Sequence, residues 1–152
     1  MAGLQEARET LRKTFGFADF RAGQGEIIAA ILEGKDVLAV MPTGGGKSLC
    51  YQLPALLRDG LTIVVSPLIA LMRNQVAQLQ GFGVAAGALN SGNSREETGA
   101  VFDALRERRL RLLYVAPERL ALDGTKALAA EIRQPVDHDA SPSRSCASGA
   151  AG

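Results

Sequence analysis

The sequence predicts an α/β fold, in which helices flank a mostly parallel β-sheet. Short apolar runs alternate along the chain with longer segments of helical apolar spacing. Strands and helices that alternate in this way form right-handed crossovers, and the helices cover both faces of the sheet. A glycine-rich stretch at residues 43–48 follows the first apolar run and precedes a helical segment. This order of strand, glycine loop and helix is typical of folds that bind phosphate groups.

Each element has its own signal. Two helices are expected before the sheet, over residues 4–15 and 25–32, and the aromatic residues between them could serve only to pack these helices onto the sheet. Strands are predicted at residues 36–41, 61–66, 84–89 and 110–115, with helices at 48–58, 67–80, 94–108 and from 117 onward. Pro67 and Pro117 occupy first-turn positions that favour a helix start, and Ser94 with the acids after it predicts another.

Length and composition are those of one globular domain. The 152 residues can enclose one sizeable core. The 17 basic and 16 acidic residues nearly balance, so net charge does not indicate a nucleic-acid partner. Cys50, Cys146 and His138 are too few and too scattered for a metal site, and no zinc is expected.

Signals for export or membrane insertion are not expected either. The N-terminus carries charges where a signal peptide needs an apolar core. No run approaches the ~20 apolar residues of a membrane span. We therefore expect a cytoplasmic protein that does not contact a membrane.

The glycine loop has the residues needed to wrap a polyphosphate. Its glycines carry no Cβ, so the backbone can adopt positive φ and bring N–H groups to phosphate oxygens. Lys47 can reach the β- and γ-phosphates of a nucleotide, and the Ser48 hydroxyl is a natural ligand for Mg²⁺. A helix that begins at Lys47 adds the positive end of its dipole. The candidate nucleotide-binding residues of the loop are Thr43, Gly44, Gly45, Gly46, Lys47 and Ser48.

The loop departs from the usual pattern at one position. Met41 stands where the G-x-x-x-x-G-K-[ST] pattern has its first glycine. Three glycines beside a surface lysine are also compatible with a flexible linker. The strand before the loop and the helix after it favour the phosphate-binding interpretation.

Four blocks of sequence carry a resemblance to a known family. They are residues 15–24 (FGFADFRAGQ), 41–52 (MPTGGGKSLCYQ), 65–76 (VSPLIALMRNQV) and 113–120 (LYVAPERL). With these blocks in order, the chain resembles the N-terminal half of the first RecA-like domain of RecQ family DNA helicases, over about residues 11–130. That family has methionine at the position of Met41. The resemblance implies an incomplete RecA-like sheet of the P-loop NTPase class.

The resemblance assigns roles outside the loop. The first block is similar to an adenine-recognition motif, in which Gln24 contacts the adenine edge, Arg21 helps to orient it and Phe17 offers an aromatic face. The third block is similar to a motif that lies along single-stranded DNA. Its candidate DNA contacts are Ser66, Arg73, Asn74 and Gln75. Spacing alone would instead place these polar side chains on a solvated helix face.

As a whole, the resemblance implies an ATP-dependent DNA helicase of 3′-to-5′ polarity that acts in DNA repair and recombination. Its cofactors would be ATP and Mg²⁺, and its partner single-stranded or partly duplex DNA. The expected organisation is N-terminal helices with the adenine motif at residues 1–35, a partial ATP-binding domain at 36–136, and a disordered, aberrant tail at 137–152. The tail contains no aliphatic residue larger than alanine, so it has little to bury.

Hydrolysis in this family requires an acidic pair at the end of a buried strand, to hold Mg²⁺ and to polarise water. The candidate segment, residues 136–139, fails because the residues before it include two charges and a proline and cannot form a central strand. We therefore expect a truncated or frame-shifted helicase product. It should bind ATP weakly and neither hydrolyse ATP efficiently nor unwind DNA, with Lys47 and Ser48 as the remaining catalytic residues.

Other functions remain open at this stage. A fragment of an RNA helicase or of a DNA translocase would share the same loop. A non-catalytic module that binds ATP or DNA and regulates an intact helicase would also lack the acidic pair. A small-molecule kinase would need a substrate lid and acceptor-binding acids, for which the sequence offers no candidates.

Overall fold

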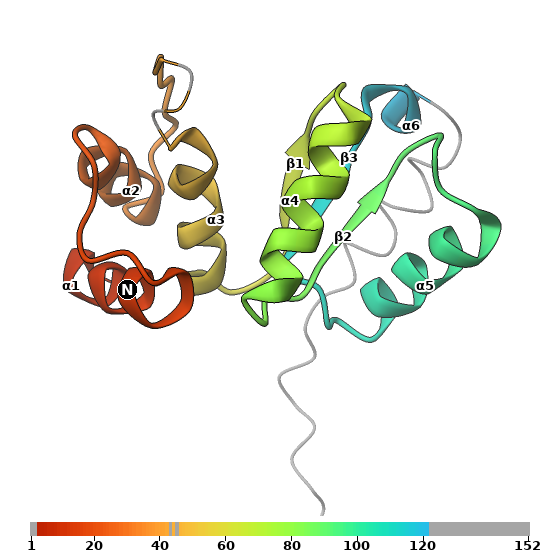
Figure 1. The fold of residues 1–152 in the computed structure, drawn as a ribbon, viewed down its shortest axis with the longest axis horizontal. Helices are drawn as coiled ribbons and strands as arrows, with labels where there is room; N and C mark the ends of the chain where they lie inside the picture. The colour runs from red at the N-terminus through yellow and green to blue at the C-terminus, as the bar shows by residue number, and fades with distance from the viewer. Residues whose placement is uncertain (1–2, 43, 45, 122–152) are drawn as a thin grey trace, which may run out of the picture.

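The computed structural model describes residues 3–42, 44 and 46–121. Helices on the N-terminal side lie beside a small sheet that carries the remaining helices (Figure 1). In chain order the elements are α1 (Leu4–Thr10), the π-helical turn η1 (Leu11–Phe15), α2 (Gln24–Leu32), α3 (Lys47–Leu57), β1 (Thr62–Val65), α4 (Ile69–Gly81), β2 (Ala86–Leu89), α5 (Arg95–Arg106), β3 (Leu112–Val115) and α6 (Pro117–Ala121).

The sheet is three-stranded and parallel, in the order β1-β3-β2. The central strand β3 pairs with both neighbours, and all four of its residues are buried. Strands that are covered on both faces read as continuous apolar runs, as Leu112–Val115 does. The predicted α/β class with parallel strands is confirmed.

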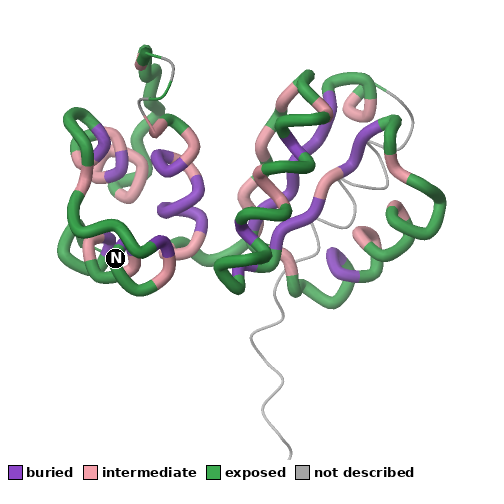
Figure 2. The backbone as a smooth tube through the Cα atoms, in the orientation of Figure 1, coloured by how far each residue is buried: buried purple, intermediate pink, exposed green. Residues whose placement is uncertain are grey.

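The two faces of β3 pack against different helices. Leu112 and Tyr114 belong to a core cluster shared with Met72 and Leu79 of α4. The alternate residues, Leu113 and Val115, pack with Leu105 of α5 in a second cluster. Side chains alternate across a strand with period two, so one continuous apolar strand serves both cores. Figure 2 shows buried positions along the strands and on the inner sides of the helices.

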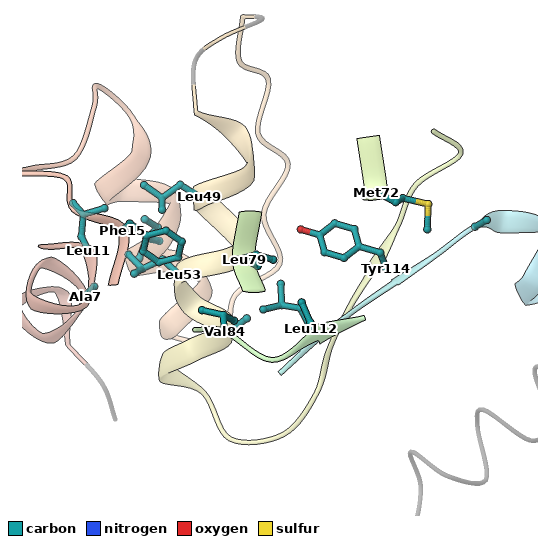
Figure 3. Packing of buried hydrophobic residues seen from close by; sticks show 14 residues of the cluster. Ala7, Leu11, Phe15, Leu49, Leu53, Met72, Leu79, Val84, Leu112 and Tyr114 are labelled. Atoms are coloured by element: carbon teal, nitrogen blue, oxygen red, sulfur yellow. The ribbon is translucent and has the colours of Figure 1, made fainter. Parts of the chain in front are cut away.

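The larger cluster also joins the N-terminal helices to the sheet. Ala7, Leu11 and Phe15 of α1 and η1 face Leu49 and Leu53 of α3 (Figure 3). The Phe15 ring packs edge-on against Phe82, which follows α4, with centroids 5.4 Å apart. Phe15 and Phe20 therefore pack the N-terminal helices onto the rest of the fold, whereas Phe17 is 48% exposed.

The predicted strand at residues 36–41 is wrong. This segment forms no strand, and the side chains of Leu38 and Val40 are 95% and 92% exposed. It rises as an extended connection between α2 and α3 (Figure 1). An apolar run becomes a buried strand only where neighbouring strands supply hydrogen bonds and helices cover it. The described strands pair with one another, and none lies beside this run.

The two outer edges of the sheet differ. Along β2, Gln80 Nε2 donates to Ala86 O at 3.1 Å and Asn93 Nδ2 donates to Ala88 O at 2.7 Å. These side chains satisfy carbonyl groups that an added strand would otherwise pair with. On β1, Ile63 and Val65 remain 39% and 54% exposed on the face that α5 covers elsewhere. The cover of the sheet is therefore incomplete over β1.

Most other predicted elements are confirmed with shifted ends. Ser94 caps α5 by accepting from Glu97 N at 3.1 Å, and Glu97 Oε2 accepts from Ser94 N at 2.7 Å. This capping box is the helix start that the sequence predicts. The helix expected at Pro67 begins only at Ile69, because Leu68 stays extended as its N-cap. Within the described ranges no helix has the length and apolarity needed to cross a membrane. The predicted domain boundary at residue 136 and the tail lie outside the described residues.

Burial of Tyr114 and Cys50 should make the free energy of unfolding depend on pH. Burial is the largest cause that raises the pKa of each group above its ordinary value, although Gln52 opposes it at Tyr114. A raised pKa means that the fold favours the neutral form, so this stability is present below the unfolded-state pKa and is lost as pH rises. The free energy of unfolding should fall as pH rises above about 8.5, where the unfolded-state thiol ionises, and more steeply above about 10, where the unfolded-state phenol ionises. Urea titrations measure it. A Tyr114→Phe variant should show a shallower decline, and equal declines would contradict this explanation.

Candidate nucleotide-binding site

The glycine loop turns sharply and delivers the chain into α3. Gly44 and Gly46 both have left-handed backbone conformations, with φ of 80° and 77°. Gly46 is the N-cap, and α3 begins at Lys47 as the sequence predicts. The helix therefore directs its free backbone N–H groups and positive dipole end toward the loop. Thr43 and Gly45, also predicted to bind nucleotide, lie outside the described residues.

A side chain on Gly46 would displace the end of the Gln24 side chain. A Cβ built on Gly46 would lie 2.2 Å from Gln24 Nε2. Real Cβ atoms do not approach other atoms so closely, and the conformation is itself unfavourable for residues other than glycine. Glycine at this position is thus favoured by the backbone conformation, and it leaves room for the Gln24 amide. The glycine backbone of the loop and the N-terminus of α3 are both features that suit a bound phosphate group.

The adenine-motif residues lie against this loop. Gln24 is 2% exposed, and its Nε2 donates to Gly46 O at 3.0 Å while its Oε1 accepts from Arg21 N at 2.8 Å. Arg21 reaches the other side of the loop, where NH1 donates to Gly44 O at 2.8 Å. The structure therefore brings these two predicted residues together with the loop. Phe17, a few residues earlier in the chain, is 48% exposed. Its ring is therefore accessible to solvent.

The charged and hydroxyl groups of the loop stand at the start of α3. Lys47 is exposed, which leaves its ammonium group free to move toward an anion. Ser48 is partly buried, and its Oγ accepts a hydrogen bond from Gln75 Nε2 at 2.8 Å. The two residues thus differ in mobility. Lys47 can follow a ligand, whereas Ser48 is held by the neighbouring helix.

The contact between Ser48 and Gln75 belongs to a chain of three side chains. Tyr51 OH donates to Gln75 Oε1 at 2.7 Å, while Gln75 Nε2 donates to Ser48 Oγ. Sequence reasoning placed Gln75 among the DNA contacts and gave Tyr51 no role. A signal was available for Tyr51, because residues three apart on a helix lie on one face. No pattern in the sequence indicates that Gln75 of α4 turns toward α3.

A buried contact anchors the same part of α3 to the sheet. Gln52 Nε2 donates to Tyr114 OH of β3 at 3.0 Å. The rings of Tyr51 and Tyr114 meet edge-on, with centroids 6.4 Å apart. Together these contacts fix α3 against both β3 and α4. The position of the loop is therefore set by the sheet as well as by the N-terminal helices.

Ser66 and Arg73, two of the remaining candidate DNA contacts, lie by the carboxyl end of the sheet. Ser66 follows β1 directly, and its Oγ accepts from Leu68 N at 3.3 Å. Arg73 of α4 donates from NH2 to Gly92 O, which follows β2, at 2.6 Å. Asn74 is exposed on α4. In open α/β sheets this edge is where ligands bind.

The described part of the chain has no cluster of the usual metal-binding side chains. Among residues 3–42, 44 and 46–121 there is no group of His, Cys, Asp and Glu side chains that could hold a metal ion. Cys50 is buried, and burial raises the pKa of its thiol, so this side chain behaves as a small apolar residue. Ser48 is the described residue best suited to a Mg²⁺ ion at the loop.

Comparison with known proteins gives a consistent result. The family model described as DEAD/DEAH box helicase matches residues 21–134. The chain is 53% identical over 114 residues to an ATP-dependent DNA helicase RecQ of Haemophilus influenzae, covering 75% of this chain and 18% of that protein. It is 50% identical over 120 residues to the RecQ helicase of Synechocystis sp., covering 79% of this chain and 25% of that protein. A probable ATP-dependent DNA helicase RecS of Bacillus subtilis is 48% identical over 118 residues, 77% of this chain and 23% of its own length.

Proposed function

Because this chain belongs to the DEAD/DEAH box helicase family, and its relatives are RecQ-like DNA helicases, we propose that it binds ATP with Mg²⁺ and contacts DNA. The chain spans 18% to 25% of the length of the three relatives described above. Within a longer protein it would form the nucleotide-binding part of a 3′-to-5′ ATP-dependent DNA helicase. Repair and recombination are the processes that this activity would serve.

The observation that carries the proposal is the loop held by Arg21 and Gln24. Both side chains donate to loop carbonyl groups, at 2.8 Å and 3.0 Å, and the loop leads straight into the N-terminus of α3. With the carbonyls occupied in this way, the backbone N–H groups are left to face an anion. A flexible linker would need none of these contacts. The geometry supports a preformed phosphate site.

Each residue of the site has a role that its chemistry suits. Lys47 would neutralise the β- and γ-phosphates, and the Ser48 hydroxyl would bind Mg²⁺. Gln24 would read the adenine edge with Arg21 beside it, while its amide keeps its contact with Gly46 O. Phe17 would cover the base with its ring. Bound Mg²⁺ would supply charge neutralisation between the phosphate oxygens.

The DNA contacts would lie along the carboxyl edge of the sheet. Ser66, Arg73 and Asn74 would contact the phosphodiester backbone of single-stranded or partly duplex DNA. Arg73 already reaches across from α4 to the segment after β2, so it spans this edge. Contacts of this kind hold the strand without reading its sequence.

We do not expect these 152 residues alone to hydrolyse ATP efficiently. The two charges and the proline of residues 131–136 lead us to expect no buried strand there, and so no acidic pair that would polarise an attacking water. Residues 131–139, where it would be sought, lie outside the described residues. The chain would bind ATP and DNA without efficient hydrolysis or unwinding.

Binding of a fluorescent ATP analogue to the 152-residue chain tests this proposal. We expect saturable binding that strengthens when Mg²⁺ is added and that unlabelled ATP displaces. ATPase assays with and without single-stranded DNA should show no efficient turnover. Absence of saturable binding would contradict the proposed nucleotide site, and DNA-stimulated hydrolysis would contradict the proposed lack of turnover.

A regulatory module that binds ATP or DNA without catalysis is the second candidate. It is favoured by the same preformed loop, and it would not need the acidic pair that hydrolysis requires. Adding the chain to an intact RecQ helicase in a strand-displacement assay distinguishes a regulatory module from the nucleotide-binding part of a helicase. A change in the unwinding rate at saturating ATP would support the regulatory role.

A further inference from the structure

Gln75 has a different environment from the exposed residues before it on α4. It is partly buried, and both atoms of its amide are used by α3, through Ser48 and Tyr51. Arg73 and Asn74, by contrast, are exposed. We propose that Gln75 is a positioning residue for the Mg²⁺ ligand Ser48 and not a DNA contact. This inference rests on the proposed function, because it assigns Ser48 to the metal.

The amide of Gln75 can serve Ser48 both with and without the cation. In the structure Nε2 donates to Ser48 Oγ, which suits a serine whose oxygen is not bound to a metal. A serine that binds Mg²⁺ through its oxygen needs an acceptor for its own proton on the side away from the ion. Rotating the amide by half a turn presents Oε1 to that proton.

Tyr51 makes this exchange possible without leaving a polar atom unpaired. Its hydroxyl now donates to Gln75 Oε1 at 2.7 Å. After the amide turns, the same hydroxyl can accept from Nε2, because a phenol is both donor and acceptor. The three side chains therefore satisfy one another in either state. A leucine at position 75 would fill similar space but could not hold the Ser48 hydroxyl.

The position of Gln75 on α4 relates the proposed metal site to the proposed DNA contacts. Gln75 is the next residue but one after Arg73, whose guanidinium reaches the segment after β2. The side chain that orients the metal ligand is thus on the same helix as the proposed DNA contacts. Outer-shell partners of metal ligands typically change metal affinity by about ten- to a hundredfold when they are removed.

The test compares Gln75→Leu with Gln78→Leu, a matched change at an exposed position of the same helix. Binding of the fluorescent ATP analogue is measured with Mg²⁺ and with EDTA. For Gln75→Leu we expect the Mg²⁺-dependent gain in affinity to fall by about tenfold or more, with little change in EDTA. The control should behave as the wild type. Circular dichroism establishes that each variant is folded.

A double-mutant comparison separates positioning from a general structural effect. If Gln75 acts through Ser48, Gln75→Leu should change nothing further in a Ser48→Ala background. Where Gln75→Leu fails to fold, Tyr51→Phe carries the test, since it removes only the hydroxyl and should lower the Mg²⁺-dependent gain a few-fold. An unchanged Mg²⁺ dependence in Gln75→Leu, or an equal loss with EDTA, would overturn the inference. No Mg²⁺-dependent binding by the wild type would instead refute the proposed function.

Discussion

Lys47→Ala is expected to weaken ATP binding about ten- to a hundredfold while leaving the fold intact. Lys47 is the first residue of α3, so its ammonium group adds a full positive charge to the dipole end that faces the loop. Hydrogen bonds to charged groups are worth about 1.5–3 kcal/mol, which corresponds to this range of affinity. Because Lys47 is exposed, its truncation removes little packing. Displacement of the fluorescent ATP analogue measures the loss.

Lys35→Ala is the matched control for the loss of one positive charge. Lys35 is also exposed and pairs with Glu33 on the surface, where ion pairs contribute little. It should bind the analogue as the wild type does, with a similar melting temperature. If Lys47→Ala bound ATP as tightly as Lys35→Ala, the loop would not be the phosphate site.

Gly46→Ala is expected to damage both stability and nucleotide binding. The added Cβ would lie 2.2 Å from Gln24 Nε2, so the Gln24 amide must shift and break its hydrogen bond to Gly46 O. The left-handed conformation, with φ of 77°, adds about 1–2 kcal/mol of strain for a residue with a Cβ. We expect the free energy of unfolding to fall by about 2–4 kcal/mol. ATP binding should also fall below detection, because the carbonyl turned by Gln24 would no longer be held.

Gly34→Ala separates the strain from the collision. Gly34 has φ of 80°, and a Cβ there would meet no atom within 4 Å. This variant should lose only the strain energy and keep its affinity for ATP. Urea titrations of both variants measure the difference. Equal losses of stability in the two would show that the contact between Gln24 and the loop contributes nothing.

The elements that the sequence predicted correctly are those whose signal is local. Leu112–Val115 is apolar throughout because it is buried on both faces, and Ser94 with Glu97 carries its own capping geometry. The strand expected at residues 36–41 failed although its composition is similar. Whether such a run enters a sheet depends on which strands are beside it, and composition does not contain that information.

The predictions for the residues of the candidate site also depend on whether the signal is local. Gly46, Lys47 and Ser48 are recognisable because a phosphate loop is one continuous segment, and the structure places the helix start at Lys47. The contacts of Gln75 with Ser48 and Tyr51 join two helices that are distant in sequence. A single sequence cannot show which way a polar residue of an amphipathic helix turns. The DNA role that the resemblance implies for Gln75 is therefore the part of the site that the proposed positioning role would replace.

The amides of Gln80 and Asn93, which donate to carbonyl groups of β2, leave only one border of the described sheet open to a further strand. With Ala86 O and Ala88 O already engaged, β2 offers a poor template for another strand. The other border, β1, keeps apolar side chains at Ile63 and Val65 in contact with solvent. Any further strand, whether from the same polypeptide or from a second molecule, would be recruited at β1. Self-association of this chain through its sheet should therefore begin at β1.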